Sequence, residues 1–298
     1  MKINKNIATI FLLIVLILAG CTPDSQNDNY VNEILKWKHK RDSSLTKPTG
    51  WLSVAGLYWL EQGENTFGSD STNQFIFPAK APKFMGSFVM DGTTVSVKIN
   101  DNVDVFVDSS RINKMVLKND NEKGTHLLKH GSLSWYVLKR SEKIGIRLRD
   151  SEHPNIKSFK GIDHFPIVKE WRIKARLEPF DSIKTIRIAN VLGQISDFEW
   201  PGTLVFEIDG QTHKLDPIIS GKRYWLLFAD ETSGEETYGA GRFLYTDKVD
   251  STGYTYIDFN KSYNPPCVFT PFATCPLPPL QNRLSVRITA GEKNWGIH

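Results

Sequence analysis

The stretch that decides the fold is Leu204-Val205-Phe206-Glu207-Ile208-Asp209-Gly210-Gln211-Thr212-His213. Apolar and polar side chains alternate before Asp209-Gly210, and this dipeptide favours the type I′ turn that joins two antiparallel strands. A second such stretch has Phe88-Val89-Met90 before Asp91-Gly92 and Thr93-Thr94-Val95-Ser96-Val97 after it. Both stretches therefore predict β-hairpins.

Short runs of alternating or β-branched residues recur along the rest of the chain. They lie near residues 51–60, 74–77, 103–108, 132–139, 143–149, 171–177, 183–189, 224–229 and 254–259. Regularly spaced short strands favour sandwiches or barrels, and no repeat of fixed period points to a propeller or a solenoid. The sequence predicts an all-β protein of two packed β-sandwich or barrel-like domains.

One amphipathic helix is expected before the strands, over residues 29–45. Its apolar positions at helical spacing are Tyr30, Val31, Ile34, Leu35 and Trp37. Charged residues stand between them, and Pro48-Thr49-Gly50 ends the pattern. We expect this helix to lie across the face of a domain.

The first 20 residues have the composition of a signal peptide. Lys2 and Lys5 precede an apolar run from Ile7 to Gly20, which is shorter than the roughly 20 apolar residues that a membrane span needs. Leu18-Ala19-Gly20-Cys21 resembles the bacterial lipobox, which implies diacylglycerol on the Cys21 sulfur and usually a third acyl chain, such as palmitate, on its amine. The alternative is an ordinary secretory signal. We expect a lipoprotein of the cell envelope, held on the extracytoplasmic side of a membrane.

These features predict an order of segments along the chain. The irregular stretch 150–166, with Pro154, Gly161 and Pro166, is the expected boundary between the two β domains. The expected segments are a signal peptide (1–20), the lipidated cysteine with a polar tether and the helix (21–50), an N-terminal β domain (51–150) and a C-terminal β domain (151–298) with a Pro- and Cys-rich loop (263–282).

The charge of the mature chain is close to balanced. Of 37 Lys and Arg residues, two precede Cys21, which leaves 35 against 33 Asp and Glu, a formal net charge of +2. This balance gives no electrostatic reason for binding nucleic acid. The Gly-x-Ser-x-Gly and His-Glu-x-x-His motifs do not occur, and no motif predicts a cofactor or a metal.

Two cysteines remain after lipidation, Cys267 and Cys275. In an oxidising compartment an even pair at this spacing favours a disulfide that closes a small loop. Unpaired structural thiols, a metal-binding pair and a reactive thiol are the alternatives.

Several motifs together resemble one bacterial and archaeal family. They are Gly50-Trp51-Leu52, Gly56-Leu57-Tyr58-Trp59-Leu60, Gly63-Glu64-Asn65-Thr66-Phe67-Gly68-Ser69-Asp70, Thr237-Tyr238-Gly239-Ala240-Gly241-Arg242-Phe243-Leu244, Asp258-Phe259-Asn260, Tyr263-Asn264-Pro265-Pro266-Cys267, Cys275-Pro276-Leu277-Pro278-Pro279 and Ala290-Gly291-Glu292-Lys293. The family is domain of unknown function 1684, and the resemblance extends over residues 30–293. It implies no established reaction.

The N-terminal half also resembles the layout of a forkhead-associated (FHA) β-sandwich. The resemblance rests on Gly63 to Gly68, then Asn73-Gln74-Phe75-Ile76-Phe77, then repeated short strands and Gly131 before another strand. In the FHA family an arginine follows the glycine of the opening strand and binds phosphothreonine. In this chain Ser69 occupies that position. The resemblance therefore concerns the fold, because the arginine that binds phosphothreonine is missing.

A candidate pocket lies where the predicted strand 254–259 leads into the loop 263–282. Its residues are Tyr238, Arg242, Tyr256, Asp258, Asn260, Tyr263, Asn264 and Asn282. Strand geometry places Tyr256 and Asp258 on one face, so that Asp258 is a candidate base or ligand and the Asn side chains are candidate donors. Arg242 follows a Gly-Ala-Gly turn whose amides suit an anion. The alternative is an exposed strand face followed by ordinary turns.

Basic residues alternate on two further strands. Arg147 and Arg149 share one face, and Arg172, Lys174 and Arg176 share another. A combined cationic face would bind an acidic polymer or a lipid head group. The alternative is a solvated face that acidic neighbours neutralise.

These observations leave two hypotheses for function. The first is a lipoprotein that binds a small molecule or glycan, or that acts as a scaffold. The second is a hydrolase whose polar site contains Asp258, Asn260, Asn264 and Arg242. Whether the protein is an enzyme stays open at this stage.

Overall fold

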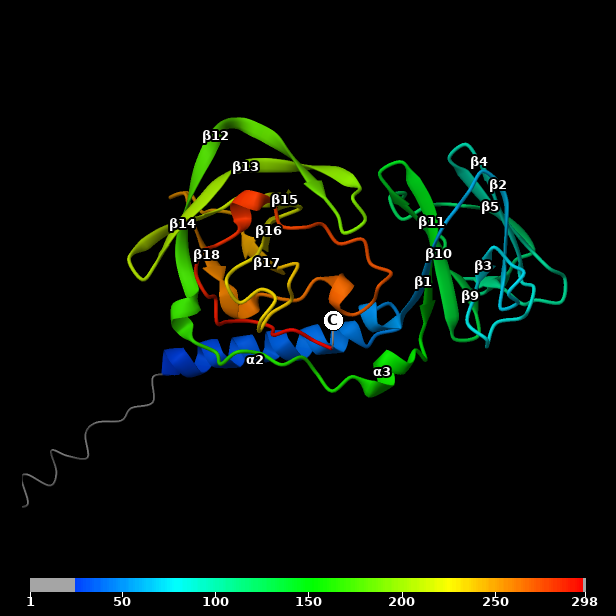
Figure 1. The fold of residues 1–298 in the computed structure, drawn as a ribbon, viewed down its shortest axis with the longest axis horizontal. Helices are drawn as coiled ribbons and strands as arrows, with labels where there is room; N and C mark the ends of the chain where they lie inside the picture. Colours follow the sequence, from blue (N-terminus) through cyan, green and yellow to red (C-terminus); the bar gives the residue numbers. More distant parts are fainter. Residues whose placement is uncertain (1–24, 297–298) are drawn as a thin grey trace, which may run out of the picture.

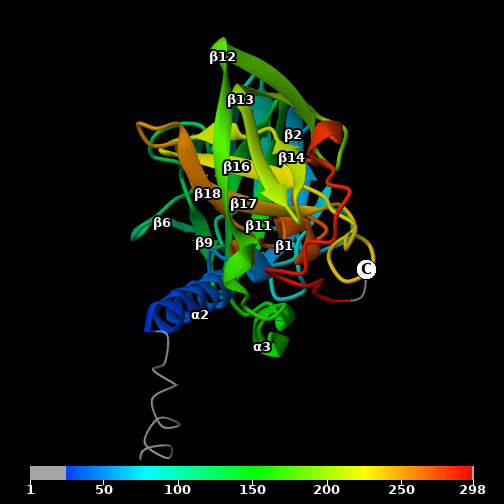
Figure 2. The same ribbon diagram turned by 90° about the vertical axis from the view of Figure 1, so that its left-hand side faces the viewer.

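The computed structural model describes residues 25–296 and confirms the all-β prediction. Figure 1 shows two β lobes side by side, one containing β1 to β11 and the other β12 to β18. Helix α2 (Ser25–Leu45) runs along the base of the second lobe and ends where the two lobes meet. The view from the side, in Figure 2, again places α2 at the base and the long strands β12 and β13 above it.

The N-terminal lobe is a sandwich of two sheets. The first has the order β1-β11-β10-β9-β6-β7, with β1 (Val54–Trp59), β11 (Lys143–Asp150), β10 (Leu133–Arg140), β9 (Leu128–His130), β6 (Phe106–Val107) and β7 (Ser110–Arg111). The second has the order β3-β2-β4-β5-β8, with β3 (Phe75–Ile76), β2 (Gly63–Gly68), β4 (Gly86–Asp91), β5 (Thr94–Ile99) and β8 (Lys114–Leu117).

One apolar core lies between these two sheets. Phe67 from β2 is fully buried, stacks on Phe88 at 4.4 Å between ring centroids and meets Trp135 edge-on at 5.9 Å. These aromatic contacts join the two sheets, because Trp135 belongs to β10 of the opposite sheet. Burial of large rings in such pairs is a main source of stability for a sandwich of this size.

The C-terminal lobe is built on two smaller sheets. The first has the order β14-β13-β12-β18, with β14 (Gln211–Leu215), β13 (Ile195–Ile208), β12 (Arg172–Ala189) and β18 (Tyr254–Asp258). The second has the order β15-β16-β17, with β15 (Ile218–Ser220), β16 (Arg223–Phe228) and β17 (Arg242–Asp247). Leu204, Leu226 and Phe259 are fully buried in the core that the two sheets share.

Both predicted hairpins are present, but only one has the predicted turn. Asp209 and Gly210 lie at φ +51° and +76° between the paired residues Ile208 and Gln211, as a type I′ turn requires. In the other hairpin Asp91 pairs with Thr94, so the central residues are Gly92 and Thr93 and only Gly92 has a positive φ. This pattern is typical of type II′, which needs glycine at the first central position alone.

Helix α2 is longer than predicted and is attached to the C-terminal lobe at both ends. Ile34 and Leu45 are buried. The Tyr30 hydroxyl donates to Asp258 Oδ1 at 2.9 Å, and Arg41 Nε pairs with Glu292 Oε1 at 3.0 Å. None of the helices in residues 25–296 combines the length and the apolar composition needed to cross a membrane. The predicted signal peptide, Cys21 and the start of the tether lie outside the described residues.

Short helices and the loop 263–282 complete the described part of the chain. The helices are η1 (Trp51–Ser53), α3 (Pro154–Ser158), η2 (Lys169–Trp171), η3 (Phe259–Lys261), η4 (Pro266–Val268) and η5 (Leu280–Asn282). Thr270 donates to the Val54 carbonyl, and Arg147 Nη2 donates to the Phe272 carbonyl at 3.2 Å. The loop is therefore packed against β1 and β11 of the other lobe.

Candidate functional site

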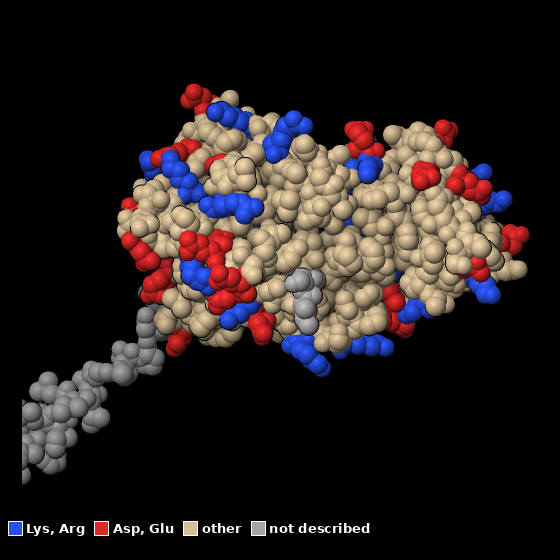
Figure 3. Space-filling view, in the orientation of Figure 1, with Lys and Arg blue, Asp and Glu red and all other residues tan. Residues whose placement is uncertain are grey.

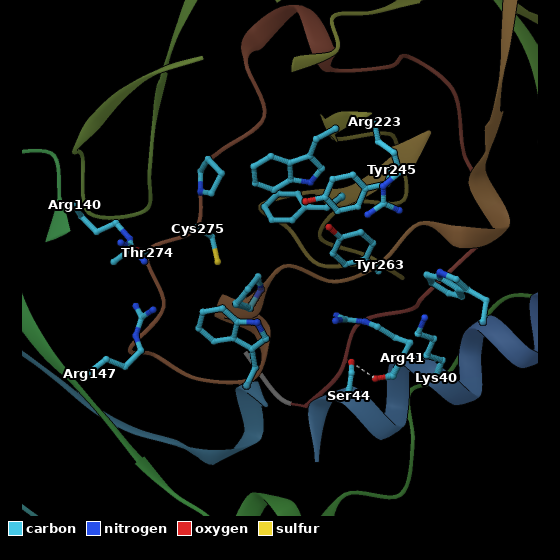
Figure 4. Close-up of a pocket in the computed structure, with 16 residues that line it drawn as sticks. Lys40, Arg41, Ser44, Arg140, Arg147, Arg223, Tyr245, Tyr263, Thr274 and Cys275 are labelled. Atoms are coloured by element: carbon cyan, nitrogen blue, oxygen red, sulfur yellow. Dashed lines mark hydrogen bonds between the residues drawn. The ribbon is translucent and has the colours of Figure 1, made fainter. Parts of the chain in front are cut away.

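A cavity of about 620 Å³, here called the central cavity, lies between the two lobes and α2. Its lining residues are Trp37, Lys40, Arg41, Ser44, Trp51, Arg140, Arg147, Arg223, Trp225, Phe243, Tyr245, Tyr263, Pro266, Thr274, Cys275 and Pro276. Figure 4 shows these side chains converging from α2, from the strands of both lobes and from the loop. The volume is within the range of pockets that hold small ligands.

The lining of the central cavity is basic and aromatic. It contains five Lys and Arg residues and six aromatic residues, and no Asp or Glu. Arg41 is neutralised by buried Glu292, and Arg140 by Asp120 at 2.7 Å. Within the described residues, Lys40, Arg147 and Arg223 form no ion pair with a carboxylate. The cavity therefore carries uncompensated positive charge.

Arg147 is the most constrained of these cations. It lies on β11 with only 2% of its surface exposed, because the second lobe covers the face of the sheet that would otherwise be solvated. Nη2 donates to the Phe272 carbonyl, the guanidinium lies 5.3 Å from the Trp51 ring centre, and Nε has no hydrogen-bond partner. Burial lowers the pKa of Arg147, but a guanidinium keeps its charge in proteins. A buried charge without an anionic partner is unusual, and an anion in the cavity would compensate it.

An aromatic wall lies opposite, on β16, β17 and the start of the loop. Tyr245 is nearly parallel to Trp225 at 5.9 Å and to Tyr263 at 6.2 Å. Arg223 lies 4.2 Å from the Tyr245 ring centre, and Arg41 lies 4.8 Å from that of Tyr263. Burial raises the pKa of Tyr263, which keeps its phenol neutral. The wall offers flat apolar faces with positive charges beside them.

A second cavity of about 480 Å³, here called the side cavity, adjoins the first. Both cavities are lined by Trp37, Arg223, Tyr245 and Tyr263. The side cavity differs in charge, because carboxylates line it as well as basic residues. They are Glu33, Asp247, Asp250 and Asp258.

The structure does not bring the eight predicted pocket residues into one cavity. Tyr263 lines both cavities, and Tyr256 and Asp258 line the side cavity. Asp258 Oδ1 accepts from Tyr30, and the Asn260 amide bonds the same hydroxyl and the Val168 carbonyl. These contacts attach α2 to the lobe.

The remaining predicted residues lie within the protein. Arg242 is fully buried against Asp230, with 2.7 Å between Nη2 and Oδ2. Asn264 donates from its side chain to the Lys293 carbonyl, and Asn282 donates to the Asp216 carbonyl. Tyr238 is hydrogen-bonded to Cys267. Each of these contacts stabilises the loop 263–282 or its neighbours.

The predicted disulfide is not formed, since Cys267 and Cys275 are both free thiols in the structure. The Cys267 amide donates to the Cys275 sulfur at 3.1 Å. Hydrogen bonding from Cys275 lowers the pKa of Cys267, and the same contact, together with burial, raises the pKa of Cys275. Cys275 lines the central cavity as a neutral thiol.

Sequence reasoning missed most of the central cavity. Arg147 was interpreted as part of a cationic face that ligands or solvent would reach, whereas packing of the lobes encloses it. Trp37 was expected in the apolar stripe of the helix, yet it lines both cavities. Cation clustering on β11 was the available signal. On the face seen in Figure 3, charges of both signs are interspersed.

Three solved structures resemble parts of the chain. An uncharacterized protein from gene locus rrnAC0354 of Haloarcula marismortui is 24% identical, with a TM-score of 0.39, over 46% of this chain and 78% of that one. The FhaA FHA domain complexed with the intracellular domain of Rv3910 is 14% identical over 31% and 97%, with a TM-score of 0.23. The Rv0020c FHA structure is 18% identical over 33% and 93%, with a TM-score of 0.22. Neighbours this distant carry no argument about ligands.

A search of curated proteins found no match. Residues 157–293 match the family described as "Protein of unknown function (DUF1684)". This match confirms, for the C-terminal part of the chain, the family that the sequence motifs predicted.

Proposed function

We propose that the protein is a lipoprotein anchored outside the cytoplasm through Cys21, and that its central cavity binds a small anionic molecule with a flat, apolar part. One observation carries the proposal: five basic and six aromatic side chains line a single cavity that contains no carboxylate. Acidic sugars and aryl phosphates have this combination of properties.

The charges of the lining support an anionic ligand. A guanidinium donates two parallel hydrogen bonds to a carboxylate or phosphate, and hydrogen bonds to charged groups are stronger than those between neutral groups. Arg147 lines the cavity without a carboxylate partner, and within the described residues Arg223 and Lys40 form no ion pair either. Partial enclosure strengthens each contact, because the effective dielectric constant is lower than in water.

The chemistry of the lining supports binding over catalysis. Its candidate nucleophiles are Ser44, Thr274 and Cys275, and no His, Asp or Glu lines the cavity to act as their base. The Ser44 hydroxyl donates to the Arg41 carbonyl, as a residue in a helix often does, and the Cys275 thiol has a raised pKa. A nucleophile with a partnered base, which a hydrolase needs, is lacking among these residues.

The anchor would hold the cavity near a membrane surface. Cys21 precedes the first residue of α2 by four residues, which span at most about 14 Å when fully extended. Trp37, Lys40 and Arg41 of the same helix line the central cavity. Trp37 and Arg41 come 12 and 16 residues after Ser25, or roughly 18–24 Å along the helix, so the cavity would lie within about 40 Å of the anchored cysteine.

Binding is tested with the full-length chain in nanodiscs of neutral lipid. 1-Naphthyl phosphate and the uncharged 1-naphthyl glucoside are titrated into the protein, and the heat of binding is measured by isothermal titration calorimetry. We expect saturable binding of the phosphate, at least about 10-fold tighter than that of the glucoside and weaker at high salt. Equal affinities for the two compounds would contradict an anion site.

Anchoring is tested separately by metabolic labelling. Cells that express the chain are given a radiolabelled palmitate, and we expect incorporation into the wild type and none into the Cys21→Ala variant. Equal labelling of both chains would exclude lipid on Cys21. Binding in the central cavity does not depend on this result.

A further inference from the structure

The basic residues of the central cavity form two separate groups. Figure 4 shows Arg140 and Arg147 on one side, and Arg41, Lys40 and Arg223 on the opposite side, with Cys275 between them. The first group lies on β10 and β11 of the N-terminal lobe. The second lies on α2 and β16, which belong to the C-terminal lobe. Each lobe therefore supplies one positive end of the cavity.

Each group contains a cation without an acidic partner among the described residues. In the first group it is Arg147, because Arg140 is paired with Asp120. In the second group Arg41 is paired with Glu292, which leaves Lys40 and Arg223. Arg147 is buried, whereas Lys40 and Arg223 are exposed and Asp247 is the cross-strand neighbour of Arg223. Two ends that each present a cation without an ion pair suit a ligand with two negative charges.

The rest of the cavity lining is largely apolar. Trp51, Phe243, Pro266 and Pro276 belong to it, and Cys275, which Figure 4 shows between the two basic groups, adds a neutral thiol. A charged or strongly hydrated group would lose its hydration there without finding a partner, so this region favours a flat or hydrocarbon spacer. The aromatic lining suits stacking against a ring.

From this arrangement we propose that the ligand is a dianion: two acidic groups joined by an apolar spacer, one group at Arg147 and the other at Arg223 and Lys40. The inference rests on the proposed anion-binding function and specifies its ligand class. Once one end is bound, the second end binds intramolecularly at a high effective concentration, so a matched dianion gains affinity over a monoanion. Because the two ends belong to different lobes, such a ligand bridges them.

The test compares alkane-1,ω-bisphosphonates with alkylphosphonates of the same chain length, from four to about twelve carbons. Isothermal titration uses the full-length chain in nanodiscs of neutral lipid. We expect one spacer length at which the bisphosphonate binds at least about 10-fold tighter than its monophosphonate partner. Longer and shorter spacers should lose that advantage.

Two variants locate the ends, and one serves as control. Arg147→Gln and Arg223→Gln should each reduce the ratio of bisphosphonate to monophosphonate affinity towards one. Arg223 is exposed, so its variant keeps the test decisive if the buried variant folds poorly. The control is Arg176→Gln. Arg176 is an exposed cation that pairs with Glu178 and lines neither the central nor the side cavity, so its loss should leave the affinity ratio unchanged.

The outcomes separate the two proposals. Bisphosphonates and monophosphonates that bind with equal affinity at every length would overturn the dianion inference and leave the anion site standing. Absence of binding by every phosphonate would overturn the anion site itself. If the same spacer length remains the best in both Arg147→Gln and Arg223→Gln, with an unchanged affinity ratio, the dianion binds elsewhere. That result would overturn the assignment of its two ends.

Discussion

Replacement of Arg147 by Met is expected to leave the fold at least as stable while it weakens ligand binding. Arg147 is 2% exposed and has no carboxylate partner among the described residues. The buried charge costs several kcal/mol in lost hydration. Against this cost stand hydrogen bonds to Phe272 and Tyr136 and a contact with the Trp51 ring.

These stabilising contacts can be given rough magnitudes. Two hydrogen bonds from a charged donor contribute about 3–6 kcal/mol together, and a desolvated cation–π contact about 1–2 kcal/mol. Their sum is close to the cost of burying the charge, and Met restores apolar contacts of similar volume. We therefore expect the free energy of unfolding of Arg147→Met to rise by about 0–2 kcal/mol.

The matched comparison is Arg242→Met. Arg242 is also fully buried, but it pairs with Asp230 at 2.7 Å, so its loss strands a carboxylate. Breaking such a pair costs about 3–5 kcal/mol. Urea unfolding of both variants measures the contrast, and titration with 1-naphthyl phosphate should show at least about 10-fold weaker binding for Arg147→Met.

If Arg147→Met loses more than about 2 kcal/mol of stability and binds the phosphate as tightly as the wild type, Arg147 is a structural residue. An unoccupied anion site would then not explain its burial.

Other contacts give further predictions. Tyr30→Phe removes a 2.9 Å hydrogen bond to buried Asp258, so urea unfolding should show a loss of about 1–3 kcal/mol, and an unchanged midpoint would argue against this attachment of α2. Burial lowers the pKa of His164 from 6.5 to about 4. Between these pH values the unfolded chain binds a proton at His164 that the folded chain does not. The free energy of unfolding should therefore fall as the pH drops from 6.5 towards 4, by at most about 3 kcal/mol. His164→Gln should flatten this part of the pH profile, and a profile identical to that of the wild type would refute the assignment. Iodoacetamide should modify half-buried Cys267 faster than Cys275, whose thiol is buried with a raised pKa; the reverse order in mass spectrometry would contradict the structure.

The fold was largely predictable because its signals are local. Alternation around Asp209-Gly210 predicts strands and their turn, and both are present with the expected register. The helical spacing of Ile34 predicts the buried stripe of α2. The type of the second turn was wrong because the pairing of Asp91 with Thr94 shifts the turn by one residue.

The candidate site was less predictable because it depends on packing between distant segments. Alternation correctly places Arg147 opposite Ile146, but it carries no information about a second lobe that covers the arginine. Arg242 follows a glycine-rich turn that suits an anion. Its actual partner is the carboxylate of Asp230, which lies earlier in the chain than that turn. In both cases the sequence predicts the direction of a side chain, whereas the tertiary structure determines its partner.

Anomalous diffraction from crystals soaked in selenate tests the anion site most directly. We expect a selenium peak in the central cavity with a selenate oxygen within about 3 Å of the Arg147 guanidinium, which lines that cavity. Selenate bound only at surface lysines would contradict an anion site at Arg147.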